Sequence, residues 1–130
     1  MSTATANTCK FNKTYAYLKY LLTFHSLWPY GYNCALRPEN NAQHQTLAQR
    51  AQAAIRAVSG TAYTIGPSCS TLYATTGSST DYTDVTGNAT YSYTYELRDT
   101  GTYGFSLPAN QIQPTVRETW AGVLSMLKDA

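Results

Sequence analysis

The chain has 130 residues, which suits one small domain with a single modest core. Charged residues make up only 12% of it and the net charge is +2 without a basic run, so nucleic acid is not an expected partner. No apolar stretch reaches the roughly 18 residues of a membrane span, and the first residues, MSTATANTCKFNK, lack the apolar core of a signal peptide.

The N-terminal part changes from polar to strongly apolar. Residues 1–14 are predicted to form a loosely ordered lead-in, and YAYLKYLLTF follows from Tyr15 to Phe24. So short an apolar run suits either a helix or a strand. Its first half favours the end of a helix, and Leu21–Phe24 favour a buried strand. A turn is predicted next, at WPYGY, because it contains proline and glycine.

A helix is predicted from Asn40 or Asn41 to about Val58. One face is apolar and consists of Leu47, Ala51, Ala54, Ile55 and Val58. His44 falls on the opposite, polar face, which predicts a solvated imidazole. Gly60 stands where a helix stop is expected.

In the middle of the chain, the residue pattern predicts two strands and a loop. Thr61–Tyr73 reads as a strand broken at Gly66-Pro67, and residues 74–87 read as a loop with one short helical turn near Asp81–Val85. Residues 90–97 alternate strictly, which predicts a strand. Tyr91, Tyr93, Tyr95 and Leu97 share its inward face, and Ser92, Thr94 and Glu96 share the other.

The last predicted element is a helix that starts with the capping-box pattern TVRE at Thr115. Its apolar stripe consists of Val116, Trp120, Val123, Leu124 and Leu127. Strands that alternate with helices predict a layered α/β domain.

Glu96 is the single acidic residue in the strand TYSYTYEL. On the polar face, at the strand's end, it looks into a cleft or into solvent. Residue-type statistics alone favour a surface carboxylate paired with Arg98 over a catalytic acid.

The segments around Glu96 carry a family resemblance. YELRDTGTYGFSLPANQIQPT, followed by ETWAGV, closely resembles the C-terminal segment of zinc metallocarboxypeptidases of the carboxypeptidase A type. The resemblance covers roughly residues 15 to 129. It implies a partial carboxypeptidase-like domain over residues 15–130, with the mixed sheet of the C-terminal half of the family's α/β/α sandwich. It also implies that Glu96 is the general base that activates a zinc-bound water.

Two other segments resemble the family's substrate site, and they imply that peptide or protein C-termini are the partners. CSTLYATTGSSTDY is similar to the mobile substrate loop, which implies that Tyr73 closes over the peptide and Thr80 lies at the pocket base. An uncharged pocket base implies a preference for apolar or aromatic C-terminal residues. TFHSLWPYGYNC is similar to the segment with the last zinc ligand, which implies that role for His25.

The same resemblance implies further contacts and a disulfide. Ser26 and Thr94 are expected to contact substrate. Cys34 and Cys69 stand where fungal members have a disulfide, which would leave Cys9 free or as an intermolecular partner. A secreted, extracellular protein is expected by resemblance. Two triplets, Asn12-Lys13-Thr14 and Asn88-Ala89-Thr90, match the N-glycosylation pattern.

The family's other zinc ligands have no counterpart in the sequence. Neither His25 nor His44 begins a His-x-x-Glu motif, and the Asn-Arg pair that binds the substrate carboxylate is missing. Catalytic zinc needs three protein ligands, so zinc binding by this chain alone is expected to be weak. Two hypotheses follow. One is an enzyme that hydrolyses C-terminal apolar residues once its zinc site is complete. The other is an inactive, truncated carboxypeptidase-like protein with a binding role.

A sheet cut in the middle exposes an edge and an apolar face. The sequence therefore predicts either self-association or association with a missing N-terminal half.

Overall fold

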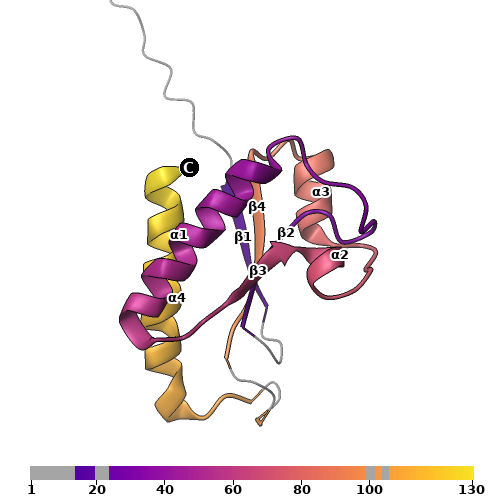
Figure 1. The fold of residues 1–130 in the computed structure, drawn as a ribbon. Coiled ribbons are helices and arrows are strands. Elements are labelled where there is room, and N and C mark those ends of the chain that lie inside the picture. Colours follow the sequence, from indigo (N-terminus) through magenta and orange to yellow (C-terminus); the bar gives the residue numbers. More distant parts are fainter. Residues whose placement is uncertain (1–13, 20–23, 99–101, 104–105) are drawn as a thin grey trace, which may run out of the picture.

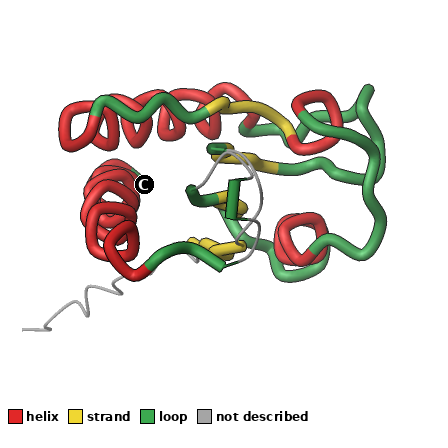
Figure 2. Tube along the Cα trace, turned by 90° about the horizontal axis from the view of Figure 1, so that it is seen from below, coloured by secondary structure: helices red, strands yellow, loops and turns green. Residues whose placement is uncertain are grey.

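A computed structural model of the protein describes residues 14–19, 24–98, 102–103 and 106–130. These residues form a four-stranded mixed sheet between two layers of helices (Figures 1 and 2). The strands are β1 (Thr14–Lys19), β2 (His25–Trp28), β3 (Thr64–Pro67) and β4 (Tyr91–Glu96), in the spatial order β1-β4-β2-β3. β1 runs parallel to β4 and β2 parallel to β3, whereas β2 and β4 are antiparallel. The predicted layered α/β fold is confirmed.

Two long helices cover one face of the sheet and two short helices cover the other (Figure 2). The long helices are α1 (Asn41–Ser59) and α4 (Ala109–Asp129), which pack against each other. The short helices are α2 (Ser68–Thr71) and α3 (Ser79–Val85). Among the helices that the structure describes, none combines the length and the hydrophobicity of a membrane span.

The core lies between the sheet and the long helices. The tyrosine face of β4 points into it as the period of two predicts, and Tyr93, Tyr95 and Leu97 are buried. The core consists of Trp28, Leu47, Ala48, Ala51, Ile55, Tyr63, Tyr93, Tyr95, Leu97 and Met126. Gly122 allows α4 to approach α1 closely, because a Cβ there would lie 2.8 Å from side-chain atoms of Ile55.

The prediction of a helix end in the first half of the Tyr15–Phe24 run is wrong. Residues Thr14–Lys19 form β1, and each of them pairs in parallel with a residue of β4. Long-range pairing decides the conformation of this short apolar run, which its local pattern leaves ambiguous. Residues 21–23, most of the predicted Leu21–Phe24 strand, lie outside the described residues, as do residue 20 and residues 1–13 of the predicted lead-in.

The helix predicted from Asn40 or Asn41 is confirmed as α1, and Gly60 ends it in the left-handed conformation, with φ of 73°. Two details differ from the prediction. Val58 is exposed at the helix end, and His44 is fully buried. The His44 ring packs against Trp28, Tyr91 and Tyr93, with ring centroids 5.0–6.2 Å apart. These aromatic rings come from the sheet and enclose the imidazole, so the prediction of a solvent-exposed His44 is wrong.

The strand predicted over Thr61–Tyr73 is much shorter in the structure. Only Thr64–Pro67 form β3, and α2 begins directly after Pro67. The short helical turn predicted near Asp81–Val85 is present as the longer helix α3.

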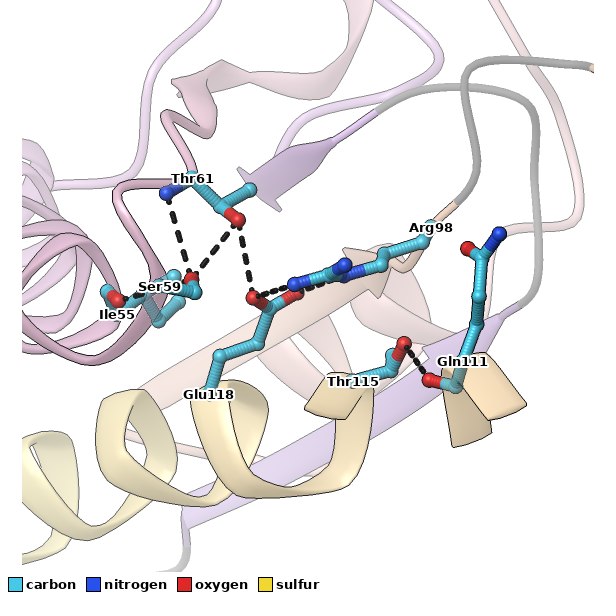
Figure 3. A network of polar contacts seen from close by, with 7 residues as sticks. All are labelled: Ile55, Ser59, Thr61, Arg98, Gln111, Thr115 and Glu118. Atoms are coloured by element: carbon cyan, nitrogen blue, oxygen red, sulfur yellow. Dashed lines mark hydrogen bonds and ion pairs between the residues drawn. The ribbon is translucent and has the colours of Figure 1, made fainter. Parts of the chain in front are cut away.

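The prediction for the C-terminal helix is wrong in its start and in its packed face. α4 begins at Ala109 and continues through Pro114. Its buried residues are Thr115, Glu118, Thr119, Gly122 and Met126, whereas most of the predicted apolar stripe is exposed. Thr115 and Glu118 are not capping groups: Thr115 Oγ1 donates to the Gln111 carbonyl, and Glu118 pairs with Arg98 (Figure 3).

Candidate active site

The candidate site lies along the antiparallel pair of β2 and β4. His25 stands opposite Glu96, and Leu27 stands opposite Thr94. Because side chains alternate along a strand, these four residues point to the face covered by α2 and α3. Ser26 and its partner Tyr95 point to the opposite face, toward α1 and α4.

His25 and Glu96 form a buried polar pair. His25 Nδ1 lies 3.1 Å from Glu96 Oε2, and the two residues are only 7% and 5% exposed. Burying a carboxylate is costly unless it is paired or hydrogen-bonded, so the contact with His25 helps to stabilise Glu96 in its buried position. The alternative of a surface carboxylate paired with Arg98 is wrong, since Glu96 is buried and Arg98 pairs with Glu118.

A pocket of about 320 Å³ opens in front of Glu96. Leu27 and Thr94 line it from the strands, and Tyr73 lines it from the segment after α2. The remaining wall is rich in hydroxyl groups and consists of Ser68, Leu72, Thr75, Thr76, Gly77, Ser78 and Ser79. Glu96 is the only charged residue among the described residues of this lining, and Tyr73 is 62% exposed.

Several contacts hold the loops that form the pocket. The Asp81 carboxylate accepts hydrogen bonds from the backbone N–H groups of Gly31 and Tyr32, at 2.9–3.2 Å. The Thr75 N–H donates to the Gly31 carbonyl at 2.9 Å. A Cβ at Gly31 would lie 2.6 Å from Thr75 Oγ1, so the glycine permits this close approach. These contacts fix the pocket wall to the segment after β2. Sequence reasoning missed Asp81.

A disulfide joins the segment after β2 to α2. Cys34, in the loop after β2, is bonded to Cys69 in α2. The structure therefore contains the pairing that the resemblance implies. It connects the exit of β2 to the helix that precedes Tyr73.

An ion pair between Arg98 and the buried Glu118 holds the end of β4 (Figure 3). Arg98 Nε donates to Glu118 Oε1 at 2.7 Å, and its terminal nitrogen contacts the other carboxylate oxygen. Thr61 Oγ1 also donates to Glu118, at 3.0 Å. Burial alone would raise the pKa of Glu118, but the hydrogen bonds from Arg98, Ser59 and Thr61 outweigh it and hold this pKa below its usual value. The pair ties the residue two positions after Glu96 to α4 and to the end of α1.

The structure brings some of the predicted site residues together. Tyr73 and Thr94 line the pocket with Glu96, and His25 lies beside Glu96. Thr80 is buried and shares a 2.7 Å hydrogen bond with Ser78, which lines the pocket, but Thr80 itself does not. The Ser26 side chain lies on the other face of the sheet, so a substrate contact from Ser26 would come from its backbone.

The residues present do not fit a zinc ion by themselves. Within the described ranges, no group of three His, Cys, Asp or Glu residues is placed to hold a metal. His44 is enclosed by aromatic rings on the opposite side of the sheet from Glu96, and Cys34 and Cys69 are bonded to each other. Among the described residues, His25 therefore supplies one donor, whereas a catalytic zinc requires three.

Comparison with known proteins decides the family. The model of the zinc carboxypeptidase family matches residues 3–122. The chain belongs to this family. It is 42% identical over 123 residues to carboxypeptidase A2 of Mus musculus, and 50% identical over 100 residues to metallocarboxypeptidase A of Trichophyton tonsurans. These matches cover 91% and 77% of the chain, but only 29% and 24% of the two relatives.

Solved carboxypeptidase-family structures share the fold of this chain. A crystal structure of thrombin-activatable fibrinolysis inhibitor superposes with a TM-score of 0.83 and 30% identity, over 90% of this chain and 29% of that one. The bovine protein in complex with tick carboxypeptidase inhibitor gives a TM-score of 0.80 and 29% identity, over 91% of this chain and 40% of that one. The resemblance deduced from the sequence is confirmed, and the chain spans well under half of these relatives.

Proposed function

We propose that this chain carries the general base and a large part of the substrate pocket of a metallocarboxypeptidase. It acts on peptides with C-terminal apolar or aromatic residues, and it requires metal donors from outside the described residues. The observation that carries the proposal is the Glu96–His25 pair at 3.1 Å, with the Glu96 carboxylate lining a pocket of about 320 Å³.

The pocket supports this choice of substrate. Among the described residues of its lining there is no cation, and Glu96 is the one charged group. Leu27, Leu72 and Tyr73 offer apolar surface to a side chain, whereas the described part of the lining offers a basic side chain no carboxylate besides the proposed base. The exposure of Tyr73 at the pocket supports the proposal that it covers a bound peptide. Glu96 is the group that accepts and returns a proton.

Completing the metal site is part of the proposal. His25 is the residue of this chain that the family resemblance assigns to zinc, and two more protein donors must be supplied. Since the chain matches only 24–29% of its relatives, polypeptide that it does not match is the source we propose for them.

The test is release of C-terminal phenylalanine or leucine from a short peptide in the presence of zinc. The chain is assayed alone and after combination with the part of the Trichophyton tonsurans relative that it does not match. Hydrolysis is expected only in the combination, and Glu96→Gln should reduce it by at least ~100-fold because the proton acceptor is lost. Glu39→Gln, which changes an exposed carboxylate, is the matched control. Release by the metal-free chain, or release unaffected by Glu96→Gln, would contradict the proposal.

A second candidate is an inactive carboxypeptidase-like chain that only binds peptides. The incomplete donor set within the described residues favours it. It predicts that a peptide ending in phenylalanine shifts the NMR signals of Tyr73 and Thr94, while no combination yields hydrolysis.

We also propose an extracellular location. The Cys34–Cys69 disulfide supports it, because disulfides form and persist in oxidising compartments. Release of the mature protein into the medium of a secreting host, with this disulfide intact, is the corresponding test.

A further inference from the structure

The outward face of α4 carries a row of exposed apolar side chains. It consists of Ile112, Val116, Trp120, Leu124 and Leu127, which are 37–58% exposed and are called here the α4 stripe. Their spacing of four, four, four and three residues places them on one side of the helix. The inward face is already occupied: Glu118 pairs with Arg98, Gly122 abuts Ile55, and Met126 Sδ lies 3.1 Å from the Tyr95 hydroxyl.

A continuous apolar row differs from scattered exposed residues. Single apolar side chains are common on protein surfaces, but contiguous ones mark surfaces that another element covers. Trp120 and Val116 are each 58% exposed, although a tryptophan usually buries much of its large surface. The α4 stripe thus has the character of a core face that lacks its counterpart in the described part of the chain.

The described sheet also ends in an unpaired edge, at β1. β1 pairs with β4 on one side, and none of the strands described pairs with its other side. Backbone N–H and C=O groups of an edge strand are a template for another strand. The relatives contain the polypeptide needed for both surfaces, since this chain accounts for only 24–29% of them while superposing well on the family fold.

We propose that the α4 stripe and the free edge of β1 dock the remaining part of a carboxypeptidase domain. The partner is a polypeptide that lays apolar side chains over Val116 and Trp120 and adds a strand along β1. This proposal rests on the proposed function, because the same polypeptide would bring the missing metal donors to His25.

Association can be tested without activity. The chain is refolded with the unmatched part of the Trichophyton tonsurans relative, and the complex is measured by size-exclusion chromatography with light scattering. Val116→Lys with Trp120→Lys should weaken the complex by at least ~30-fold, as expected for central apolar anchors. Gln45→Lys, an exposed position on α1, adds charge outside the α4 stripe and should leave the complex unchanged. All three positions are exposed, so circular dichroism should show the same fold in each variant.

The outcomes separate the docking proposal from the proposed function. A one-to-one complex that Val116→Lys with Trp120→Lys disrupts supports docking even if no peptide is hydrolysed. A homodimer disrupted by the same variants would mean that a second copy covers the α4 stripe and would overturn the proposal. A monomeric chain that forms no complex would overturn it as well.

An independent observation concerns Asn88, in the loop between α3 and β4. Asn88 has a left-handed backbone with φ of 50°, a conformation that asparagine tolerates, and its side chain is exposed. The loop around it is fixed: the Ala89 N–H donates to the Thr83 carbonyl at 3.0 Å, and Asn40 Nδ2 donates to the Thr90 carbonyl. The Thr90 side chain of the Asn88-Ala89-Thr90 triplet is exposed too.

We infer that Asn88 is an N-glycosylation site. The oligosaccharide comes from a polyprenyl diphosphate donor: the bond from sugar C1 to the phosphate oxygen breaks, the bond from C1 to Asn88 Nδ2 forms, Nδ2 loses a proton, and polyprenyl diphosphate leaves. The pocket lies near Ser79, at the start of α3, whereas Asn88 follows the end of that helix. A glycan at Asn88 therefore leaves the pocket open.

The test is expression in a secreting yeast, followed by glycosidase treatment in heavy-oxygen water and peptide mass spectrometry. Conversion of Asn88 to labelled aspartate is expected, and Asn88→Gln or Thr90→Ala should abolish it, whereas Thr90→Ser should keep it. Secreted, folded protein with unmodified Asn88 would overturn the inference. Glycosylation of Asn12, in the other triplet, is measured separately on the peptide that contains Asn12.

Discussion

The Glu96 carboxylate lies 3.1 Å from His25 Nδ1, across the antiparallel pairing of β4 and β2. The two residues are 71 positions apart in sequence, and strand register alone places them face to face. Both are buried at the side of the sheet that carries the pocket. We propose that this carboxylate and imidazole supply part of a hydrolytic site, together with metal donors that the described residues do not contain.

The first prediction concerns the Arg98–Glu118 pair that holds the end of β4. Glu118→Ala should lower the free energy of unfolding by about 3 kcal/mol, the lower end for a broken buried pair, because Arg98, whose side chain is 21% exposed, would lose its partner. Urea denaturation measures the change. Arg98→Met combined with Glu118→Leu should recover much of it, since no unpaired charge remains. A loss below about 1 kcal/mol for Glu118→Ala would contradict the assigned role of the pair.

The second prediction concerns acid sensitivity from His44. Burial lowers the pKa of His44 from 6.5 to about 4. The unfolded chain therefore binds a proton at pH values where the folded chain does not, and stability should fall as the pH drops from about 6.5 to about 4. At about 1.4 kcal/mol per pKa unit, the full loss is about 3 kcal/mol.

The matched variant for this effect is His44→Phe. The rings of Tyr91 and Tyr93 lie beside that of His44, so phenylalanine should suit the aromatic surroundings. Denaturant unfolding at pH 4, 5, 6 and 7 should show a shallower pH slope for His44→Phe than for the wild type. Identical slopes would refute the contribution of His44.

The third prediction concerns the disulfide. Cys34 and Cys69 are 35 residues apart, and the chain-entropy estimate for such a loop gives about 4 kcal/mol of stabilisation. Cys34→Ser with Cys69→Ser should lose up to this amount in denaturant unfolding, and a reducing agent should have the same effect on the wild type. Cys9→Ser is the control and should leave the unfolding curve unchanged. Insensitivity of the wild type to reduction would show that the bond contributes nothing.

The spacing of apolar residues along the sequence predicted some elements well. The alternation over residues 90–97 gave the correct inward face of β4, and helical spacing with Gly60 gave α1. Both elements are long and bury one regular face. The resemblance placed Tyr73, Thr94 and Glu96 in one site, and all three line the pocket.

Tertiary pairing determined what the sequence could not predict. Glu118 is buried on the packed side of α4 because Arg98 neutralises it, so the polar residues point inward and the apolar stripe points out. His44 is buried because three aromatic side chains from two strands surround it. Asp81 holds backbone N–H groups about 50 positions away, an arrangement that leaves no local pattern in the sequence.

The most direct measurement of the account is zinc content after equilibrium dialysis, for the chain alone and for its complex with the unmatched part of the Trichophyton tonsurans relative. We predict that the chain alone binds zinc more weakly than about micromolar, since it lacks a three-donor set. The complex should hold one zinc ion, which His25→Gln removes and His44→Phe leaves in place. Tight zinc binding by the chain alone, or a complex whose zinc does not depend on His25, would contradict the account.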